Sequence, residues 1–276
     1  MFTTLKQLTT SLLFSVILML TTSGVADVAI FDTHIHYNSM PDSEWSDERI
    51  LNLLQKNQVK HAIVTGIPNF NTQSLYKKAP DIIIPFVSVY QKADDKNNWH
   101  QNKNLLKSLQ QQLRLHHWLG IGELHLFAEN RNSEVFRAIL NLASQHNLIV
   151  QMHSDPAVID HIYQLYPNLI VIWAHAGAYP YPPLLRDYLK RYPNLYLDVS
   201  MRNKLIAPQG RLDSDWESLM MEFTNRFMLG VDTFSELRWD NYHQSIETTR
   251  QWVKQLPDTV QQDISYRNAA QLFLKK

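Results

Sequence analysis

The chain has 276 residues, with 26 Lys and Arg against 26 Asp and Glu, and therefore a formal net charge of zero at pH 7. This balance gives no general attraction to nucleic acid or to an anionic membrane surface. The absence of cysteine excludes disulfides, a lipid-modified cysteine and thiolate metal sites, so any metal must bind to His, Asp or Glu.

The N-terminal segment has the pattern of a secretory signal peptide. Lys6 lies in a short basic region, an apolar run extends from Leu12 to Leu20, and Gly24-Val25-Ala26 resembles a cleavage site. The apolar run is too short to span a bilayer comfortably, although an uncleaved anchor differs from a signal mainly in the length and flanks of this run. We expect cleavage of residues 1–26, which leaves one domain, residues 27–276, in the periplasm or outside the cell and without a membrane attachment.

Strands and helices alternate along the rest of the chain. Apolar, β-branched runs that end in polar residues occur eight times: VAIFDTHIH (28–36), HAIVTGI (61–67), DIIIPFVSVY (81–90), GIGELHLF (120–127), LIVQMHS (148–154), LIVIWAHA (169–176), LYLDVS (195–200) and FMLGVD (227–232). Their nearly continuous apolar character is typical of parallel strands that are buried on both faces.

Segments with a helical period separate these strands. Four of them have clear start signals, at Ser46, Asn132, Asp155 and Pro182. Eight strands that alternate with helices fit either a closed α/β barrel or an open doubly wound sheet. The count of eight and a mature length of about 250 residues favour the (β/α)8 TIM barrel.

Six candidate metal ligands lie at the carboxyl ends of five predicted strands, where the active sites of such barrels are built. A strand has a side-chain period of two, so the HxH pair in the first run places both imidazoles on one face. In run 169–176 the same parity assigns Val171, Trp173 and His175 to the barrel interior. The six candidates are His34, His36, Glu123, His153, His175 and Asp232.

Four imidazoles and two carboxylates form a nitrogen and oxygen site that suits zinc, manganese or iron. One metal needs only three or four protein ligands. The six candidates therefore leave room for two metals bridged by Glu123 and a water-derived hydroxide, an arrangement used for hydrolysis. Each residue alone also fits an ordinary role, such as a hydrogen-bonded histidine or an aspartate that caps a turn. Their joint position on one parity of five strand ends indicates a site.

The order of these residues resembles the amidohydrolase superfamily of metal-dependent hydrolases. HxH on the first strand, Glu on the fourth, His on the fifth and sixth and Asp on the eighth follow its pattern. The segments FDTHIH, VIWAHAGA, LYLDVS, RFMLGVDT and ISYRNAAQLF are most similar to its amidohydrolase-related branch, amidohydrolase 2. The resemblance extends over essentially the whole mature chain, Asp27 to Phe273.

The resemblance implies a role for each candidate. His34, His36 and Asp232 would bind one divalent metal, and His153 and His175 would bind a second. Asp232 would also act as the general base that takes the proton of the nucleophilic water. The chain departs from many members in one respect, because the fourth strand has Glu123 where they have a carbamylated lysine, a pattern closer to TatD-type deoxyribonucleases.

The number of metals decides between two reactions. With two metals, we expect a hydrolase of a small amide, lactone or ester. Relatives with a single metal decarboxylate aromatic acids and use the histidine of the sixth strand, here His175, as a catalytic residue. A nuclease is disfavoured by the lack of excess positive charge, and a barrel that binds without turnover is disfavoured by the complete set of ligands.

Three further residues are predicted to contact a small-molecule substrate. His125 shares the strand face of Glu123 and lies one step nearer to solvent. Arg202 follows LYLDVS, and its planar guanidinium is suited to a carboxylate or a phosphate. Trp173 lies on the predicted interior parity of its strand.

Overall fold

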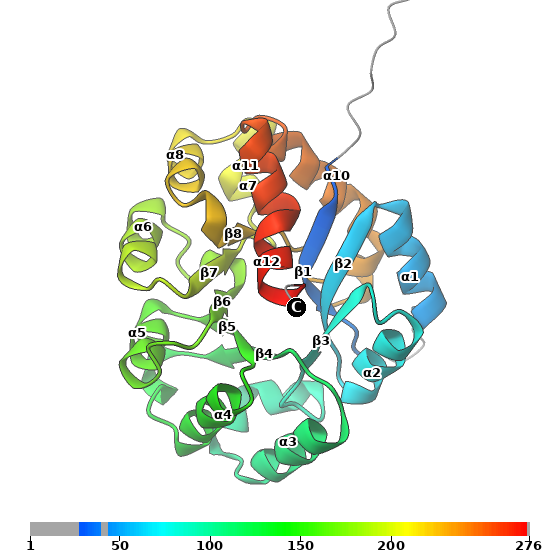
Figure 1. Cartoon of the computed structure of the whole chain (residues 1–276), viewed down its shortest axis with the longest axis vertical. Coiled ribbons are helices and arrows are strands. Elements are labelled where there is room, and N and C mark those ends of the chain that lie inside the picture. The colour runs from blue at the N-terminus through cyan, green and yellow to red at the C-terminus, as the bar shows by residue number, and fades with distance from the viewer. Residues whose placement is uncertain (1–27, 40–43, 275–276) are drawn as a thin grey trace, which may run out of the picture.

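The computed structural model describes residues 28–39 and 44–274, so the predicted signal peptide lies outside the described part. Eight parallel strands form one sheet in sequence order, and Figure 1 shows most helices around them. The strands are β1 (Ile30–His36), β2 (Val59–Thr65), β3 (Ile83–Val87), β4 (Gly120–Leu126), β5 (Ile149–Ser154), β6 (Val171–Trp173), β7 (Leu195–Asp198) and β8 (Phe227–Met228).

Hydrogen bonds between the segment that follows β8 and β1 close the sheet. The N–H of Thr33 donates to the carbonyl of Leu229 at 2.8 Å, and the N–H of Asp232 donates to the carbonyl of His34 at 2.7 Å. Because these bonds join the two edges of the eight-stranded sheet, the fold is a (β/α)8 TIM barrel, as predicted, and not an open sheet.

Several helices begin where their start signals predict. The Ser46 hydroxyl accepts the N–H of Arg49, and the Asp155 carboxylate accepts that of Val158. Among residues 28–39 and 44–274, the helices lack the combination of length and hydrophobicity that a membrane span requires. The helices are α1 (Asp47–Lys56), α2 (Asn69–Lys78), α3 (Asn104–Leu115), α4 (Glu134–Gln145), α5 (Pro156–Leu165), α6 (Pro182–Arg191), α7 (Asn203–Ile206), α8 (Ser214–Glu222), α9 (Glu236–Asp240), α10 (Tyr242–Val253), α11 (Asp258–Gln262) and α12 (Asn268–Phe273).

Side chains from six strands pack together inside the barrel, and α12 covers one end of it. The cluster consists of Phe31, Ile63, Ile84, Phe86, Ile149, Ile172 and Met228 from the strands, with Ala269 from α12. The ring of Phe273 lies 5.9 Å from that of Phe31 and 5.8 Å from that of Phe86. In Figure 1, α12 lies in front of the strands. The amino-terminal end of the barrel is thus filled, and the carboxyl-terminal end is left for a site.

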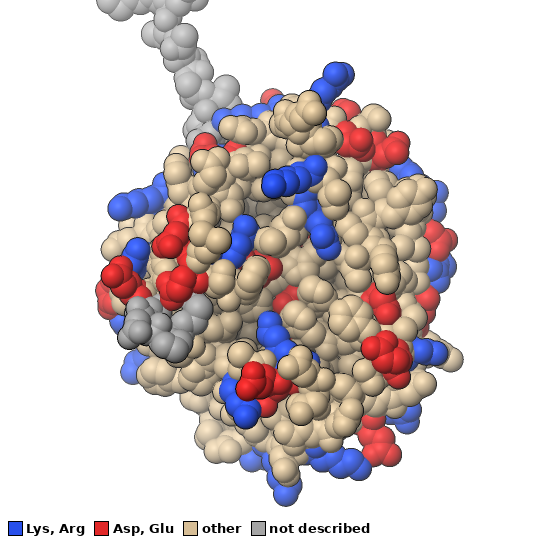
Figure 2. Space-filling view, turned by 180° about the vertical axis from the view of Figure 1, so that it is seen from behind, with Lys and Arg blue, Asp and Glu red and all other residues tan. Residues whose placement is uncertain are grey.

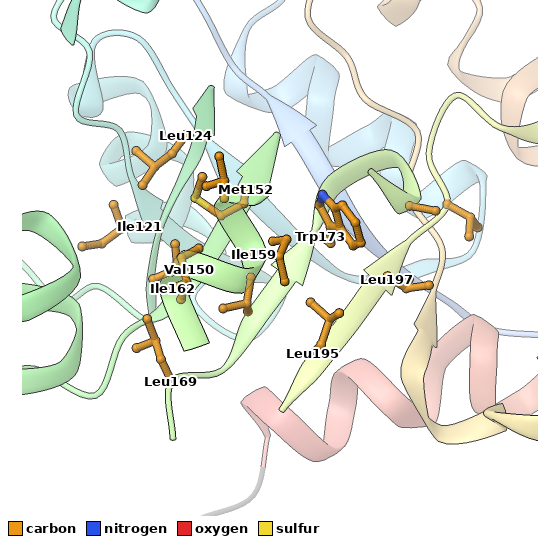
Figure 3. Packing of buried hydrophobic residues seen from close by; sticks show 14 of the residues in the cluster. Ile121, Leu124, Val150, Met152, Ile159, Ile162, Leu169, Trp173, Leu195 and Leu197 are labelled. Carbon is orange, nitrogen blue, oxygen red and sulfur yellow. The ribbon is translucent and has the colours of Figure 1, made fainter. Parts of the chain in front are cut away.

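The position of Ile172 in this interior cluster corrects the parity predicted for β6. Val171 and Trp173 belong instead to the cluster between the strands and the helices. The Trp173 ring (Figure 3) lies 5.3 Å from that of Tyr188 of α6. The prediction counted back from His175 along an unbroken strand. In the structure β6 ends at Trp173, and the chain turns before it reaches His175.

A carboxylate with three donors links α5 to α6. Asp160 accepts hydrogen bonds from the hydroxyls of Tyr188 at 2.7 Å and Tyr192 at 2.5 Å, and from the guanidinium of Arg191 at 2.9 Å. Partial burial raises the pKa of Asp160, but these donors outweigh it and lower the pKa below its ordinary value.

We expect Asp160→Asn to lower the free energy of unfolding at pH 7 by about 1 kcal/mol, a modest value because the carboxylate is partly exposed to solvent. A carboxyl whose pKa is lowered by folding stabilises above its unfolded pKa and loses this effect as the pH falls through its folded pKa. The difference in unfolding free energy between the wild type and Asp160→Asn should therefore shrink below about pH 4, as measured by urea unfolding from pH 3 to 7. Asp187→Asn, at an exposed partner of Arg191, is the control. A difference in unfolding free energy that does not change with pH would contradict the conclusion that the ionised carboxylate of Asp160 stabilises the fold.

Candidate metal centre

All six predicted ligands converge at the carboxyl-terminal end of the barrel. His34 and His36 lie on β1, Glu123 on β4, His153 on β5, His175 in the turn Ala174–Ala176 after β6, and Asp232 after β8. Their side chains are buried, apart from that of His153, which is 29% exposed. The Nε2 atoms of the two β1 histidines are 3.1 Å apart.

A shift in strand register directs both β1 histidines inward. Phe31 packs inside the barrel and Ile35 packs toward the helices, and the pairing of β1 with β2 shifts between Asp32 and Ile35. With regular alternation from Phe31, His34 and His36 would face the helices. The alternation of side chains along the strand thus predicted correctly that the two imidazoles share a face. The register shift between Asp32 and Ile35 turns that face to the barrel interior.

Two of the ligands lie in left-handed backbone just beyond their strands. The φ angle is 58° at His175 and 65° at Asp232. This conformation is uncommon for residues other than glycine and is retained where the surroundings enforce it. At Asp232 the backbone is held by the N–H bond to His34 and by the Arg238 guanidinium, which donates to its carbonyl at 3.0 Å. The chain turns sharply at both positions and aims the two side chains at the cluster.

Glu123 lies at the centre of the cluster. Its Oε1 is 3.1 Å from both His153 Nδ1 and His175 Nε2. Its Oε2 is 2.7 Å from His125 Nε2 and 3.4 Å from His36 Nε2. Burial raises the pKa of Glu123, but the surrounding imidazoles outweigh it and hold the pKa well below its ordinary value. Because an ionised carboxylate only accepts hydrogen bonds, His125 Nε2 carries the proton of the shortest of these bonds.

Asp232 has a buried oxygen that accepts no hydrogen bond from any residue in the described part of the chain. This Oδ1 lies 3.4 Å from His36 Nε2 and 3.7 Å from His34 Nε2. A buried carboxylate oxygen without a partner costs free energy, and a divalent cation would supply the missing partner.

Three sets of side chains bring their ligand atoms within 4.8 Å of one another: His34, His175 and Asp232; His34, His36 and Glu123; and Glu123, His125 and His153. The donors are nitrogen and oxygen, without sulfur, and this set suits zinc, manganese or iron. Together with the unpartnered oxygen of Asp232, the donor set fits a divalent metal.

Two residues that the sequence did not single out orient the imidazoles. Asp198 Oδ2 lies 2.7 Å from His34 Nδ1, and Ser200 Oγ lies 2.8 Å from His175 Nδ1. Burial raises the pKa of Asp198, but His34 outweighs it and lowers the pKa. When Nδ1 donates to these oxygens, the Nε2 lone pairs of both rings are available to a metal. The sequence did contain a signal for Asp198. This residue ends its strand on the same face as Tyr196, which packs against the barrel interior, so its side chain could have been predicted to point into the barrel.

A cavity of about 450 Å³ opens over the ligands, and the predicted His125 and Arg202 line it. Arg202 already donates to the backbone carbonyls of His175 at 2.7 Å and Gly177 at 3.0 Å. In Figure 2, Lys and Arg side chains stand on several sides of the middle of this face. The cavity also has walls that the sequence did not indicate: Ile67, Ala93, Lys96, Met201 and Phe234.

The prediction that Trp173 contacts substrate is wrong. Its side chain is fully buried between the barrel and the helices (Figure 3), and its indole N–H donates to the carbonyl of Ser154 at 2.9 Å. The error follows from the parity of β6, which turns this face of the strand away from the cavity.

Family models match most of the described chain. The model for amidohydrolases matches residues 111–274, from within α3 to the end of α12, and the model for TatD-related DNases matches residues 31–167. No curated protein sequence matches the chain significantly.

Solved structures share the fold at low sequence identity. A probable 2-pyrone-4,6-dicarboxylic acid hydrolase from Acinetobacter baumannii, with citric acid bound, is 16% identical with a TM-score of 0.61, and the match covers 90% of this chain and 100% of that one. A TatD homolog from Escherichia coli K12 is 15% identical with a TM-score of 0.66, over 90% and 98%. Uronate isomerase from Thermotoga maritima is 12% identical with a TM-score of 0.51, over 80% and 69%.

These neighbours support the fold, and the amidohydrolase model covers more than half of the chain. The matched part contains Glu123, His153, His175 and Asp232, four of the six residues that converge on the candidate metal centre. The chain therefore belongs to the amidohydrolase family and is an enzyme of the metal-dependent hydrolase type.

Proposed function

We propose that the chain hydrolyses a small amide, ester or lactone and that its metal is zinc. The position of Glu123 carries this proposal. It is a buried carboxylate whose Oε1 faces His153 and His175 and whose Oε2 faces His36. His34 Nε2 also lies 3.7 Å from Oε1, so histidines of both proposed ligand sets surround this one carboxylate. Such a shared carboxylate is suited to a site for two metals, and two-metal sites are common among hydrolases.

Two ligand sets share this carboxylate. His34, His36 and Asp232 would hold one metal, and His153 and His175 would hold the other. Bound metals of this kind polarise a carbonyl group and make a water molecule more acidic at neutral pH.

Asp232 is the residue that we assign to proton transfer. It lines the cavity and is buried, and its carboxylate has two oxygens, so one oxygen can contact a metal while the other takes the proton of the attacking water. The protonated carboxyl then delivers the proton to the leaving group. His175 is the second predicted catalytic residue. Its Nε2 lies 3.8 Å from Asp232 Oδ2, so the two side chains face each other within the cluster.

The shape and charge of the molecule support a small substrate. The cavity volume of about 450 Å³ is in the range of small-molecule sites, and the zero net charge provides no general attraction to nucleic acid. The alternative, a lyase with one metal that decarboxylates an aromatic acid, requires that Glu123 does not bind metal. The imidazoles around both of its oxygens favour the hydrolase.

We also propose that residues 1–26 direct export and that residues 27–276 form the mature enzyme in the periplasm or outside the cell. The basic residue Lys6, the short apolar run after it and the small residues at 24–26 support this assignment.

Three measurements on the exported protein test these proposals. Sequencing of its N-terminus should give a start near Asp27, and elemental analysis should give two divalent metals per chain. A panel of amides, esters and lactones should include substrates whose hydrolysis stops after chelation and returns with zinc. One metal per chain with carbon dioxide release from an aromatic acid would establish the lyase instead. A fully metallated protein without hydrolytic activity on this panel would contradict the proposed substrate class.

A further inference from the structure

A lysine lies on the cavity wall without an acidic partner. Lys96 belongs to the 3-10 helix Ala93–Asn97 between β3 and α3, is half-buried and lines the cavity over the metal ligands. Its Nζ lies 3.4 Å from His125 Nε2 and 6.0 Å from the centroid of the Tyr90 ring. Within residues 28–39 and 44–274, Lys96 forms no ion pair.

The groups nearest to Lys96 do not neutralise it. His125 Nε2 donates its proton to Glu123 over 2.7 Å and so has no lone pair to offer the ammonium group. Asp95, the preceding residue, accepts the backbone N–H groups of Gln91 and Lys92. Partial burial removes water from the ammonium, and these neighbours do not replace it with an acceptor.

The arginines near the metal ligands already donate hydrogen bonds to backbone carbonyls, whereas Lys96 does not. Arg202 donates to two backbone carbonyls in the turn after β6, and Arg238 donates to the carbonyls of Val231 and Asp232. Their guanidinium groups hold the left-handed turns of the site in place. Lys96 keeps its ammonium donors for a ligand.

We propose that Lys96 binds a carboxylate of the substrate and thereby selects anionic esters, amides or lactones over neutral ones. This inference rests on the proposed function, since it concerns the substrate of the same cavity. Other parts of the wall are apolar and include Ile67, Met201 and Phe234. The matching ligand has an apolar body, a carbonyl group that reaches the metal ligands and an acidic end at Lys96. An ammonium and a carboxylate brought together in a half-buried site form a charge-assisted hydrogen bond.

Two ketones that cannot be hydrolysed test this selection. 5-Oxohexanoate and 2,6-heptanedione share a methyl ketone followed by three methylene groups. The first compound ends in a carboxylate and the second in an acetyl group. Their dissociation constants are measured by calorimetry on the metal-loaded wild type and on Lys96→Met, Lys96→Arg and Lys92→Met, with metal content and melting temperature recorded for each sample. Lys92 is an exposed residue of the same loop and serves as the matched control.

We expect the wild type to bind the acid at least about tenfold more tightly than the diketone. Lys96→Met should remove this preference without weakening the binding of the diketone, whereas Lys96→Arg and Lys92→Met should keep it. A preference that persists in Lys96→Met, or that is absent from the wild type, would overturn the inference. A protein that binds no metal but shows the Lys96-dependent preference would count against the proposed function and not against this inference.

Discussion

Glu123→Ala is expected to reduce the bound metal from two ions per chain to one or none. The side chain is buried, and its two oxygens face His153 and His175 on one side and His36 on the other. Loss of a shared ligand weakens the binding of both metals. The loss of affinity should exceed the roughly 10–100-fold loss that follows mutation of residues that only hydrogen-bond to metal ligands. Elemental analysis after dialysis against a buffered low concentration of zinc measures this directly.

Two companion variants separate loss of the ligand from loss of packing. Glu123→Gln keeps the size of the side chain and removes its charge, so it should also lose metal, although a cavity is not created. Glu129→Gln changes an exposed carboxylate three residues beyond β4 and should keep two metals. One metal per chain in the wild type that survives both substitutions at Glu123 would remove the bridge and direct the search to decarboxylation of aromatic acids.

The barrel could be predicted because its signals are local and repeated. Eight apolar runs, each followed by a helix, leave few arrangements for a chain of this length. Helix starts at Ser46 and Asp155 follow from capping by their own side chains. The closure of β8 onto β1 involves residues about 200 positions apart and follows from the count of strands, not from a signal at either edge.

The site could be predicted as a set of residues but not as a geometry. Parity assumes regular strands, and three strands of the site are irregular. On β1, the register shift reverses the face before His34 and His36. On β4, the register with β5 shifts between Ile121 and Leu124, around Glu123, and β6 ends before His175. Side chains from several strand ends still meet at one mouth because that property depends on the barrel alone. The same argument placed Trp173 wrongly, since it relied on the parity of a single strand.

The residues around the ligands were harder to find. Asp198 and Ser200 act through His34 and His175, and their role depends on contacts between strands that no spacing in the sequence specifies. Lys96 lies in a 3-10 helix between β3 and α3, and only the folded chain shows that it reaches the cavity next to His125. Loop residues of this kind determine substrate choice in β/α barrels, and their placement is the part of the site that varies most freely with the sequence.

Asp232→Asn is expected to lower the rate of hydrolysis about 10²–10⁴-fold, the range for removal of a general acid or base. The substitution keeps the size of the side chain and leaves the backbone bonds of residue 232 to His34 and Arg238 unchanged. The carboxamide can still contact a metal through its oxygen, but it cannot take a proton from water and return it to the leaving group. The loss should therefore appear mainly in kcat and less in KM, as expected for an interaction made in the transition state.

The control for this variant is Asp240→Asn, which changes an exposed aspartate at the end of α9 and should leave the rate unchanged. Metal content must be measured on the same samples, because Asp232 is also assigned as a ligand. A variant that keeps at least one metal per chain and loses the rate supports proton transfer by this carboxylate. A variant with full metal content and an unchanged kcat would assign the proton to another group, and the Asp232 carboxylate would then serve metal binding alone.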